Sequence, residues 1–179
     1  MRSSEWLVVP FFTAALVLAW SGAAKLRRPG QLVRVLGAVG LPARPGGVRL
    51  IASAEFGLGT LGLIRPIAAV AVAVGLSYLS FTGFLSFLLV AKPTIGTCGC
   101  AGDRDVPPSW LHVVLDVVGA GSAFGFAAIG RGPESIVGIA APLPLHGVTF
   151  LIGVSLLGYL ASLCAAYLPQ ALISYQGER

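Results

Sequence analysis

The chain has 179 residues, of which 56% are hydrophobic and 11% are charged, and its formal net charge is +5. A soluble domain has about 25% charged residues, so this composition excludes an ordinary soluble domain and indicates a single membrane domain. The positive charge does not indicate nucleic-acid binding, because the Lys and Arg residues lie at the ends of apolar runs rather than on a soluble face.

The first apolar run extends from Trp6 to Ala24 and ends at Lys25. About 20 apolar residues are needed to cross the hydrocarbon core of a bilayer. A signal peptide is the alternative, because residues 21–24 are small, but the run is longer than the roughly 7–15 residues of a signal peptide's apolar region. The run is therefore predicted to be the first membrane-spanning helix.

A basic segment follows, between residues 25 and 49, and contains no acidic residue. Its cationic residues are Lys25, Arg27, Arg28, Arg34, Arg44 and Arg49. Apolar residues and one glycine recur within it at helical spacing, with Gln31 and Arg34 off that face; they are Leu32, Val33, Leu36, Val39 and Gly40. This pattern predicts a short helix lying at the membrane surface.

The second predicted span, Val48–Ile64, contains Glu55. An acidic side chain at the centre of a bilayer costs at least about 2.5 kcal/mol, so Glu55 is expected to face the bundle interior, a partner or water. An acid in such a position is a candidate functional residue. The alternative is that Glu55 is a neutral, hydrogen-bonded packing residue.

The third and fourth spans are predicted at Ile67–Ala91 and Ser109–Ile129. The third span is rich in Ala, Gly and Ser, which favours close helix packing. The fourth contains His112 and Asp116, whose i, i+4 spacing places both on one helix face. That face is predicted to lie close to the loop between the two spans.

The remainder of the chain is predicted to add a fifth span, at His146–Leu168, and a short tail. Cys164, near the end of this span, is predicted to be a small buried hydrophobic residue. In the fourth span, Gly121 and Gly125 match a small-xxx-small motif for helix contact. The predicted fold class is an all-α polytopic membrane helical bundle with four core helices, a fifth C-terminal span and a short interfacial helix.

Two cysteines, Cys98 and Cys100, lie in the polar segment 94–105 between the third and fourth spans. The Cα atoms of residues i and i+2 fall within disulfide range, and Gly99 permits the backbone angles that ring closure demands. A strained, exposed disulfide is oxidising and labile. The segment therefore predicts a thiol/disulfide exchange centre rather than a structural cross-link.

Two other functions fit the same pair. Two thiolates suit Cu(I), Hg(II) or another thiophilic ion, with His112 as a third ligand of a membrane transporter, although a structural zinc site generally needs four ligands. A non-catalytic assembly factor with free thiols is the third hypothesis. No metal ligand set or cofactor is assigned; a quinone is compatible with electron transfer but no residue pattern indicates one. Hydrolase and kinase motifs are not found in the sequence.

The sequence resembles the MauE branch of the DoxX-like membrane proteins over roughly residues 6–130. The resemblance lies in the order of three elements: the Ser21–Lys25 end of the first span followed by Arg28-Pro29, Glu55 in the second span, and Cys98-Gly-Cys-Ala-Gly102 after the third. Ala101 departs from the residue that the family often has before the glycine. The predicted domains are therefore a MauE/DoxX-like four-helix domain at 6–130 and, at 131–179, the fifth helix and tail.

The resemblance implies a role in disulfide maturation of a partner protein, as MauE proteins are associated with maturation of the disulfide-rich small subunit of methylamine dehydrogenase in methylamine utilisation. Family members also occur where methylamine is not the substrate. Cys98 and Cys100 would be the redox pair of a thiol-disulfide oxidoreductase, and a thioredoxin-fold protein its partner. The supporting residues would be Lys25, Glu55, His112 and Asp116. The implied location is the bacterial inner membrane as a multi-pass protein, in contact with the bilayer, with a homo-oligomer also compatible.

The charge distribution bears on the membrane side of the cysteines. With five spans and the N-terminus outside, nine Lys/Arg residues lie inside and three outside, so the positive-inside rule favours a cytoplasmic Cys98–Cys100 pair. Disulfide formation would instead favour the outer, oxidising side. Either the arginine-rich interfacial helix weakens the charge rule, or the pair receives electrons from a cytoplasmic thioredoxin and passes them outward.

Overall fold

The computed structural model describes residues 7–91, 107–129, 149, 151–161, 163–164 and 167. These residues are helical apart from short connections, and no strand occurs among them. The helices are α1 (Val8–Arg27), α2 (Gly30–Ala38), α3 (Pro45–Ile64), α4 (Ala68–Ala91) and α5 (Trp110–Ile129), with a further helical stretch at Leu151–Ala161. The all-α prediction is therefore confirmed.

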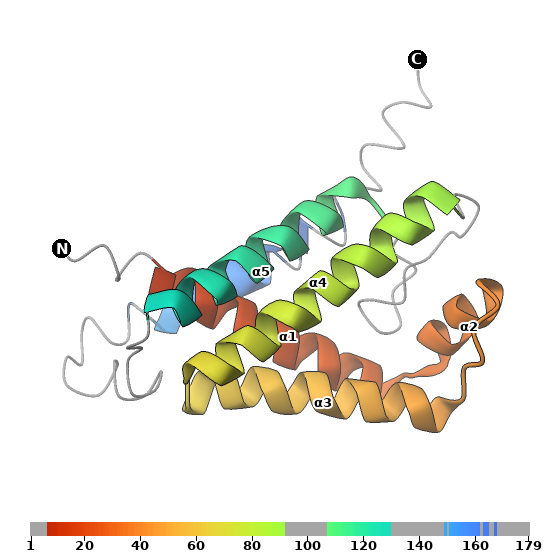
Figure 1. Cartoon of the computed structure of the whole chain (residues 1–179), viewed down its shortest axis with the longest axis horizontal. Coiled ribbons are helices and arrows are strands. Elements are labelled where there is room, and N and C mark those ends of the chain that lie inside the picture. Colours follow the sequence, from red (N-terminus) through yellow and green to blue (C-terminus); the bar gives the residue numbers. More distant parts are fainter. Residues whose placement is uncertain are drawn as a thin grey trace, which may run out of the picture.

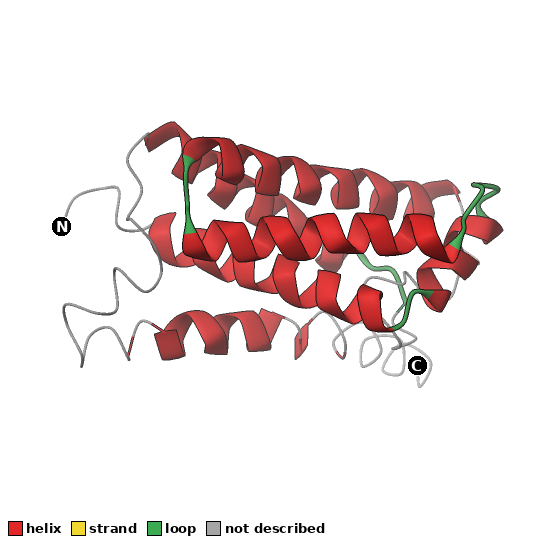
Figure 2. Ribbon diagram, turned by 90° about the horizontal axis from the view of Figure 1, so that it is seen from below, coloured by secondary structure: helices red, strands yellow, loops and turns green. Residues whose placement is uncertain are grey.

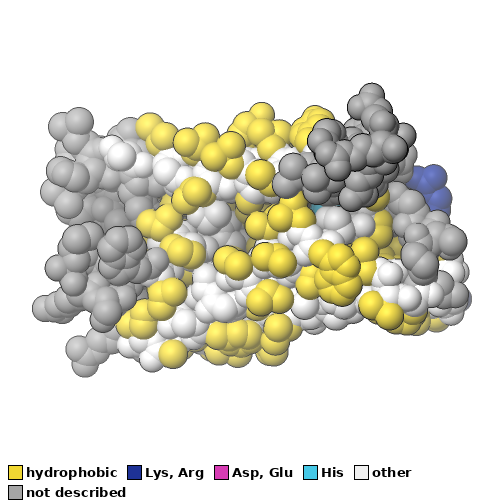
Figure 3. Space-filling model, turned by 90° about the horizontal axis from the view of Figure 1, so that it is seen from above, with side chains coloured by type: hydrophobic (Ala, Val, Ile, Leu, Met, Phe, Trp, Pro, Cys, Tyr) yellow, Lys and Arg dark blue, Asp and Glu magenta, His cyan; other side chains and the backbone are white. Residues whose placement is uncertain are grey.

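Four helices, α1, α3, α4 and α5, are long and apolar enough to cross a membrane. They lie side by side along the length of the molecule, and the short α2 lies at one end of them (Figures 1 and 2). Hydrophobic side chains spread along the bundle on the face seen in Figure 3, and the Lys and Arg side chains in view lie at one end. An apolar outer surface of this kind suits contact with lipid chains, and the protein is a multi-pass membrane protein.

The α1 and α3 helices approach each other closely at two glycines. A Cβ atom placed on Gly22 would lie 2.5 Å from the backbone nitrogen of Phe56, and one placed on Gly59 would lie 2.5 Å from the backbone nitrogen of Ala19. Small residues let helix backbones approach in a membrane, where dispersion contacts rather than water exclusion hold helices together. These two contacts fix how far α1 can slide along α3.

The α4 and α5 helices form a second packed pair, in which glycines accept aromatic rings. A Cβ on Gly75 of α4 would lie 2.9 Å from the Phe124 ring, and one on Gly119 of α5 would lie 3.0 Å from the Tyr78 ring. The two pairs meet in a shared core, where the rings of Phe11 and Phe126 stack with their centroids 4.1 Å apart. The bundle thus consists of two helix pairs joined through aromatic contacts.

Two sequence predictions were wrong in detail, and a third was correct in part. Gln31 is buried, because α2 packs against α3 and the face that carries Gln31 and Val35 is the buried one. Cys164 is exposed, since it lies off the face on which Val154 and Gly158 are buried. In the Gly121–Gly125 motif, a Cβ atom placed on Gly121 would have no described atom within 4 Å, whereas one placed on Gly125 would lie 3.1 Å from the Leu7 side chain, so of the two glycines Gly125 makes the close contact.

The predicted fifth span, His146–Leu168, lies only partly within the described residues. Its described part is helical at Leu151–Ala161. A Cβ on Gly158 would lie 3.5 Å from the Leu16 side chain, so this stretch packs beside α1. The predicted division of the chain at residue 130 and the membrane crossing of this helix stay predictions.

The α1–α3 contact can be tested with two glycines of the same helix. Gly59→Ala places a methyl group against the α1 backbone and should destabilise the protein by about 1–3 kcal/mol through overpacking. Gly57→Ala is the matched control, because nothing lies within 4 Å of its Cβ position and alanine has the higher helix propensity. Thermal unfolding in detergent measures both. Equal melting temperatures for the two variants would contradict the close contact.

Candidate functional site

Two buried charges meet between α1 and α3. The Nζ atom of Lys25 donates a hydrogen bond to Oε2 of Glu55 at 2.7 Å, and both side chains are only 5% exposed. Lys25 lies in the last turn of α1, and Glu55 lies midway along α3. The expectation that Glu55 faces the bundle interior is confirmed, and its partner is a lysine of the neighbouring helix.

The helix register explains why these two side chains meet. Gly22, one turn before Lys25, faces the α3 backbone at Ala52 and Phe56, on either side of Glu55 in sequence. Side chains on a helix tilt toward its N-terminus, so the long Lys25 side chain extends back from its own Cα to the level of Gly22. The close glycine contact therefore positions the ammonium group beside the carboxylate.

The ammonium group of Lys25 has a second partner, on α4. Its Nζ lies 4.4 Å from the centroid of the Phe81 ring, within cation–π range. The Phe81 ring in turn packs edge-on against Tyr78, with centroids 6.2 Å apart. The Tyr78 hydroxyl donates a hydrogen bond to the Ala14 carbonyl of α1 at 2.8 Å. Lys25 and Tyr78 thus connect the α1–α3 pair to the α4–α5 pair.

One carboxylate oxygen of the site has unused hydrogen-bonding capacity. Oε1 of Glu55 is buried and accepts no hydrogen bond from the residues that the structure describes. A buried acceptor left in this state costs about 1–3 kcal/mol. Such a group can accept a hydrogen bond from a donor that enters the site, or it can take up a proton.

The two titratable residues of α5, His112 and Asp116, lie in its first two turns, toward the end of the bundle that carries α2. His112 is buried, and its Nδ1 lies 2.7 Å from the Ser109 hydroxyl. Asp116, one turn further along α5, is partly buried and interacts electrostatically with Lys25 and with Tyr78. The structure therefore brings together Lys25, Glu55 and Asp116, three of the four residues predicted to support the site.

Two aromatic members of this site, Tyr78 and Phe81, were not identified from the sequence. Aromatic residues are common in membrane helices and their order along α4 contains no signal for a cation partner. The i, i+3 spacing of Tyr78 and Phe81 placed them on one face, but only the position of Lys25 shows which face is polar. We refer to Lys25, Glu55, Tyr78, Phe81 and Asp116 as the buried polar cluster.

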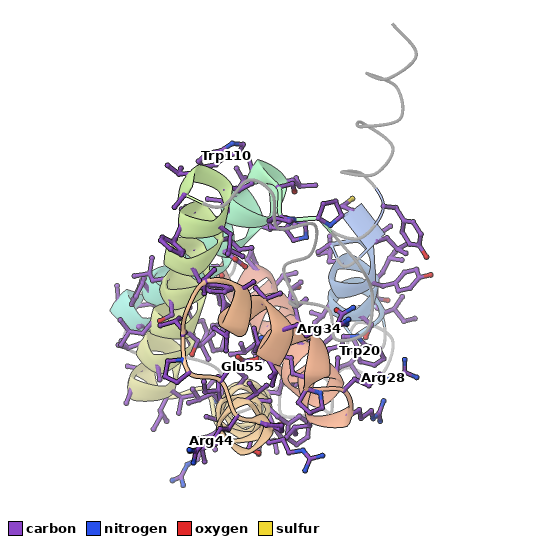
Figure 4. The ribbon with its side chains drawn as sticks, turned by 90° about the vertical axis from the view of Figure 1, so that its right-hand side faces the viewer. Trp20, Arg28, Arg34, Arg44, Glu55 and Trp110 are labelled. Atoms are coloured by element: carbon purple, nitrogen blue, oxygen red, sulfur yellow. The ribbon has the colours of Figure 1, made fainter. Side chains whose placement is uncertain are left out.

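Both predicted catalytic residues, Cys98 and Cys100, lie outside the described residues. The helices that precede and follow them are described, and the end of α4 and the start of α5 lie at the end of the bundle that carries α2 (Figure 1). Trp110, the first residue of α5, is seen at this end in Figure 4 together with Arg34 of α2. The helix ends to which segment 92–106 is attached therefore lie at the same end of the bundle as the last turn of α1, which carries Lys25.

Removal of one charge from the Lys25–Glu55 pair should destabilise the protein. Glu55→Met leaves a buried ammonium group without its carboxylate, at an expected cost of about 3–5 kcal/mol, whereas the double variant Lys25→Met/Glu55→Met removes both charges and should recover much of that loss. Arg27→Gln, an exposed change in the same turn of α1, is the control. Thermal unfolding in detergent measures all three. A single variant as stable as the wild type would contradict the pairing.

Comparison with known proteins identifies a family but no individual relative. No curated protein and no solved structure matches the chain. The family model described as methylamine utilisation protein MauE matches residues 4–130, which include α1 to α5 and all five residues of the buried polar cluster. That match covers well over half of the chain, and the protein belongs to the MauE family.

Proposed function

We propose that this MauE-family protein exchanges thiols and disulfides with a thioredoxin-fold partner through Cys98 and Cys100, in the inner membrane of a bacterial cell. The observation that supports this function most directly is the placement of the buried polar cluster. Lys25, in the last turn of α1, and Asp116, in the second turn of α5, lie toward the end of the bundle to which α4 and α5 attach the cysteine segment. Glu55 and Tyr78 extend the cluster from there to the middle of the bundle. Buried ionisable residues within membrane spans mark functional sites by default.

The proposed exchange is balanced in atoms and electrons. A thiolate of the reduced pair attacks the partner's disulfide, which forms a mixed disulfide and releases one partner thiolate. The second cysteine of the pair then attacks the chain's own sulfur in the mixed disulfide and releases the second partner thiolate. The pair ends as a disulfide and the partner as a dithiol, and the reverse sequence reduces the pair.

In this proposal the buried polar cluster handles protons and charge for the cysteines. A thiol must lose its proton before it attacks, and a nearby positive charge favours the thiolate. Glu55 has a free carboxylate oxygen, and Asp116 supplies a second carboxyl group near Lys25. These carboxyl groups would take up and return thiol protons, and His112 would fix the start of α5 through Ser109.

The direction of exchange depends on the side of the membrane. The basic segment between α1 and α3 and the cysteine segment between α4 and α5 follow an odd number of spans, so both are expected on the same side. The positive-inside rule assigns that side to the cytoplasm. There the partner would be a reductant, and a part in disulfide maturation, as the family description of methylamine utilisation suggests, would require electrons to pass onward.

The exchange reaction predicts a trapped intermediate. Cys100→Ser should accumulate a mixed disulfide between Cys98 and a thioredoxin-fold protein, because the second cysteine can no longer resolve it. A reductant-sensitive adduct on a non-reducing gel, identified by mass spectrometry, measures this. Cys164→Ser, at an exposed cysteine, is the control and should leave the adduct of the trapping variant unchanged. If neither single variant, Cys98→Ser or Cys100→Ser, gives an adduct, the exchange role is wrong.

The side of the membrane can be measured by thiol alkylation of intact cells. In a Cys164→Ser background, a membrane-impermeant maleimide should label Cys98 and Cys100 only after permeabilisation, and only after reduction if the pair is a disulfide. A cysteine introduced at exposed Arg34 should label under the same conditions as the pair. Labelling in intact cells would place the pair on the outer side and favour an oxidising role. If Arg34→Cys and the cysteine pair were labelled from opposite sides of the membrane, the expectation that the basic segment and the cysteine segment lie on the same side would be wrong.

A further inference from the structure

The arginines at the α2 end differ from Lys25 in where their side chains lie. Arg27, Arg34, Arg44 and Arg49 are exposed, whereas Lys25 is buried in its ion pair. None of these four arginines forms an ion pair with a residue that the structure describes. The sequence has no acidic residue from position 6 to position 54, so this stretch supplies no charge to neutralise them. We refer to these four residues as the arginine rim.

Two of the rim arginines, Arg27 and Arg49, lie on helix faces that contact lipid. Arg27 is the last residue of α1 and shares a helix face with Trp20, seven residues earlier, which is 69% exposed. Arg49 lies one turn inside α3 and shares a helix face with Phe56, seven residues later, which is 44% exposed. Faces that carry exposed apolar residues on a membrane helix contact acyl chains, so the adjacent guanidinium groups lie at the depth of the headgroups.

The arginines are spread around the end of the bundle instead of being gathered in one pocket. Of the rim residues labelled in Figure 4, Arg44 lies at the periphery and Arg34 lies apart from it on α2. Such a distribution suits several ligands that surround the protein. A guanidinium group binds phosphate oxygens bidentately, and a basic segment next to membrane spans is attracted to anionic lipid.

We propose that the arginine rim binds the phosphate headgroups of anionic phospholipids, and so selects an anionic lipid shell at the α2 end of the protein. This inference does not depend on the thiol chemistry. A soluble acidic protein is the rival occupant, and the lipid-facing positions of Arg27 and Arg49 favour the bilayer.

Tryptophan quenching by brominated lipids tests the proposal in reconstituted bilayers. A Trp6→Phe background leaves Trp20 and Trp110, both exposed and both in α helices of the bundle, as reporters. Dibrominated phosphatidylglycerol should occupy the lipid sites beside these residues about fivefold more readily than dibrominated phosphatidylcholine, as measured by the quenching of tryptophan fluorescence. The factor corresponds to about 1 kcal/mol for one arginine beside an anionic headgroup. Added salt should reduce the preference, because exposed charges are screened.

The variants separate charge at the rim from charge elsewhere. Arg27→Gln/Arg34→Gln/Arg44→Gln/Arg49→Gln, which removes the whole arginine rim, should lower the preference toward one, while the corresponding lysine variant should keep most of it. Arg65→Gln, at an exposed arginine in the connection between α3 and α4 at the opposite end, is the matched control and should keep the full preference. Circular dichroism and gel filtration check that each variant is folded. Equal quenching by the two lipids in the parent protein, or an undiminished preference in the glutamine variant, would overturn the proposal.

Discussion

The structure depends on the requirement that a charge in hydrocarbon be paired. Glu55 lies midway along α3, away from both ends of the span, and among the residues that the structure describes its carboxylate is paired with the ammonium group of Lys25. That pairing requires α1 and α3 to pack with their backbones in contact at Gly22 and Gly59. The ring of Phe81 then brings α4 against the same ammonium group. A single ion pair thereby links three of the four spans.

The sequence was sufficient to predict the spans because hydropathy and length determine them. The predicted spans agree with α1, α3, α4 and α5 to within about three residues, which is the usual uncertainty of helix ends predicted from a sequence. The inward orientation of Glu55 was also predictable, since the cost of an exposed acid in lipid is large. Gln31 was placed on the wrong face because apolar residues of α2 can face either lipid or the rest of the protein. The spacing of apolar residues alone does not show which face of α2 packs against the bundle.

The partner of Glu55 could not be predicted in the same way. Lys25 resembles the other cations of the basic segment in sequence, and cations at the end of an apolar run ordinarily serve as anchors at the headgroups. What distinguishes Lys25 is the register between α1 and α3. This register follows from backbone contacts at Gly22 and Gly59, and no pattern in the sequence indicates it. The same limit applies to Phe81 and Tyr78, whose roles appear only once four helices are assembled.

The position of the ion pair along the chain has a consequence for biogenesis. Thirty residues separate Lys25 from Glu55, and at about 5–20 residues per second the ribosome adds the acid roughly 2–6 s after the base. During that interval Lys25, two residues from the end of α1, is close enough to the surface for its ammonium group to stay hydrated. Glu55, midway along α3, lies farther from the surface, and when it is synthesised the chain already contains its counter-ion. The chain therefore presents its two buried charges in the order that lets a nascent protein insert both.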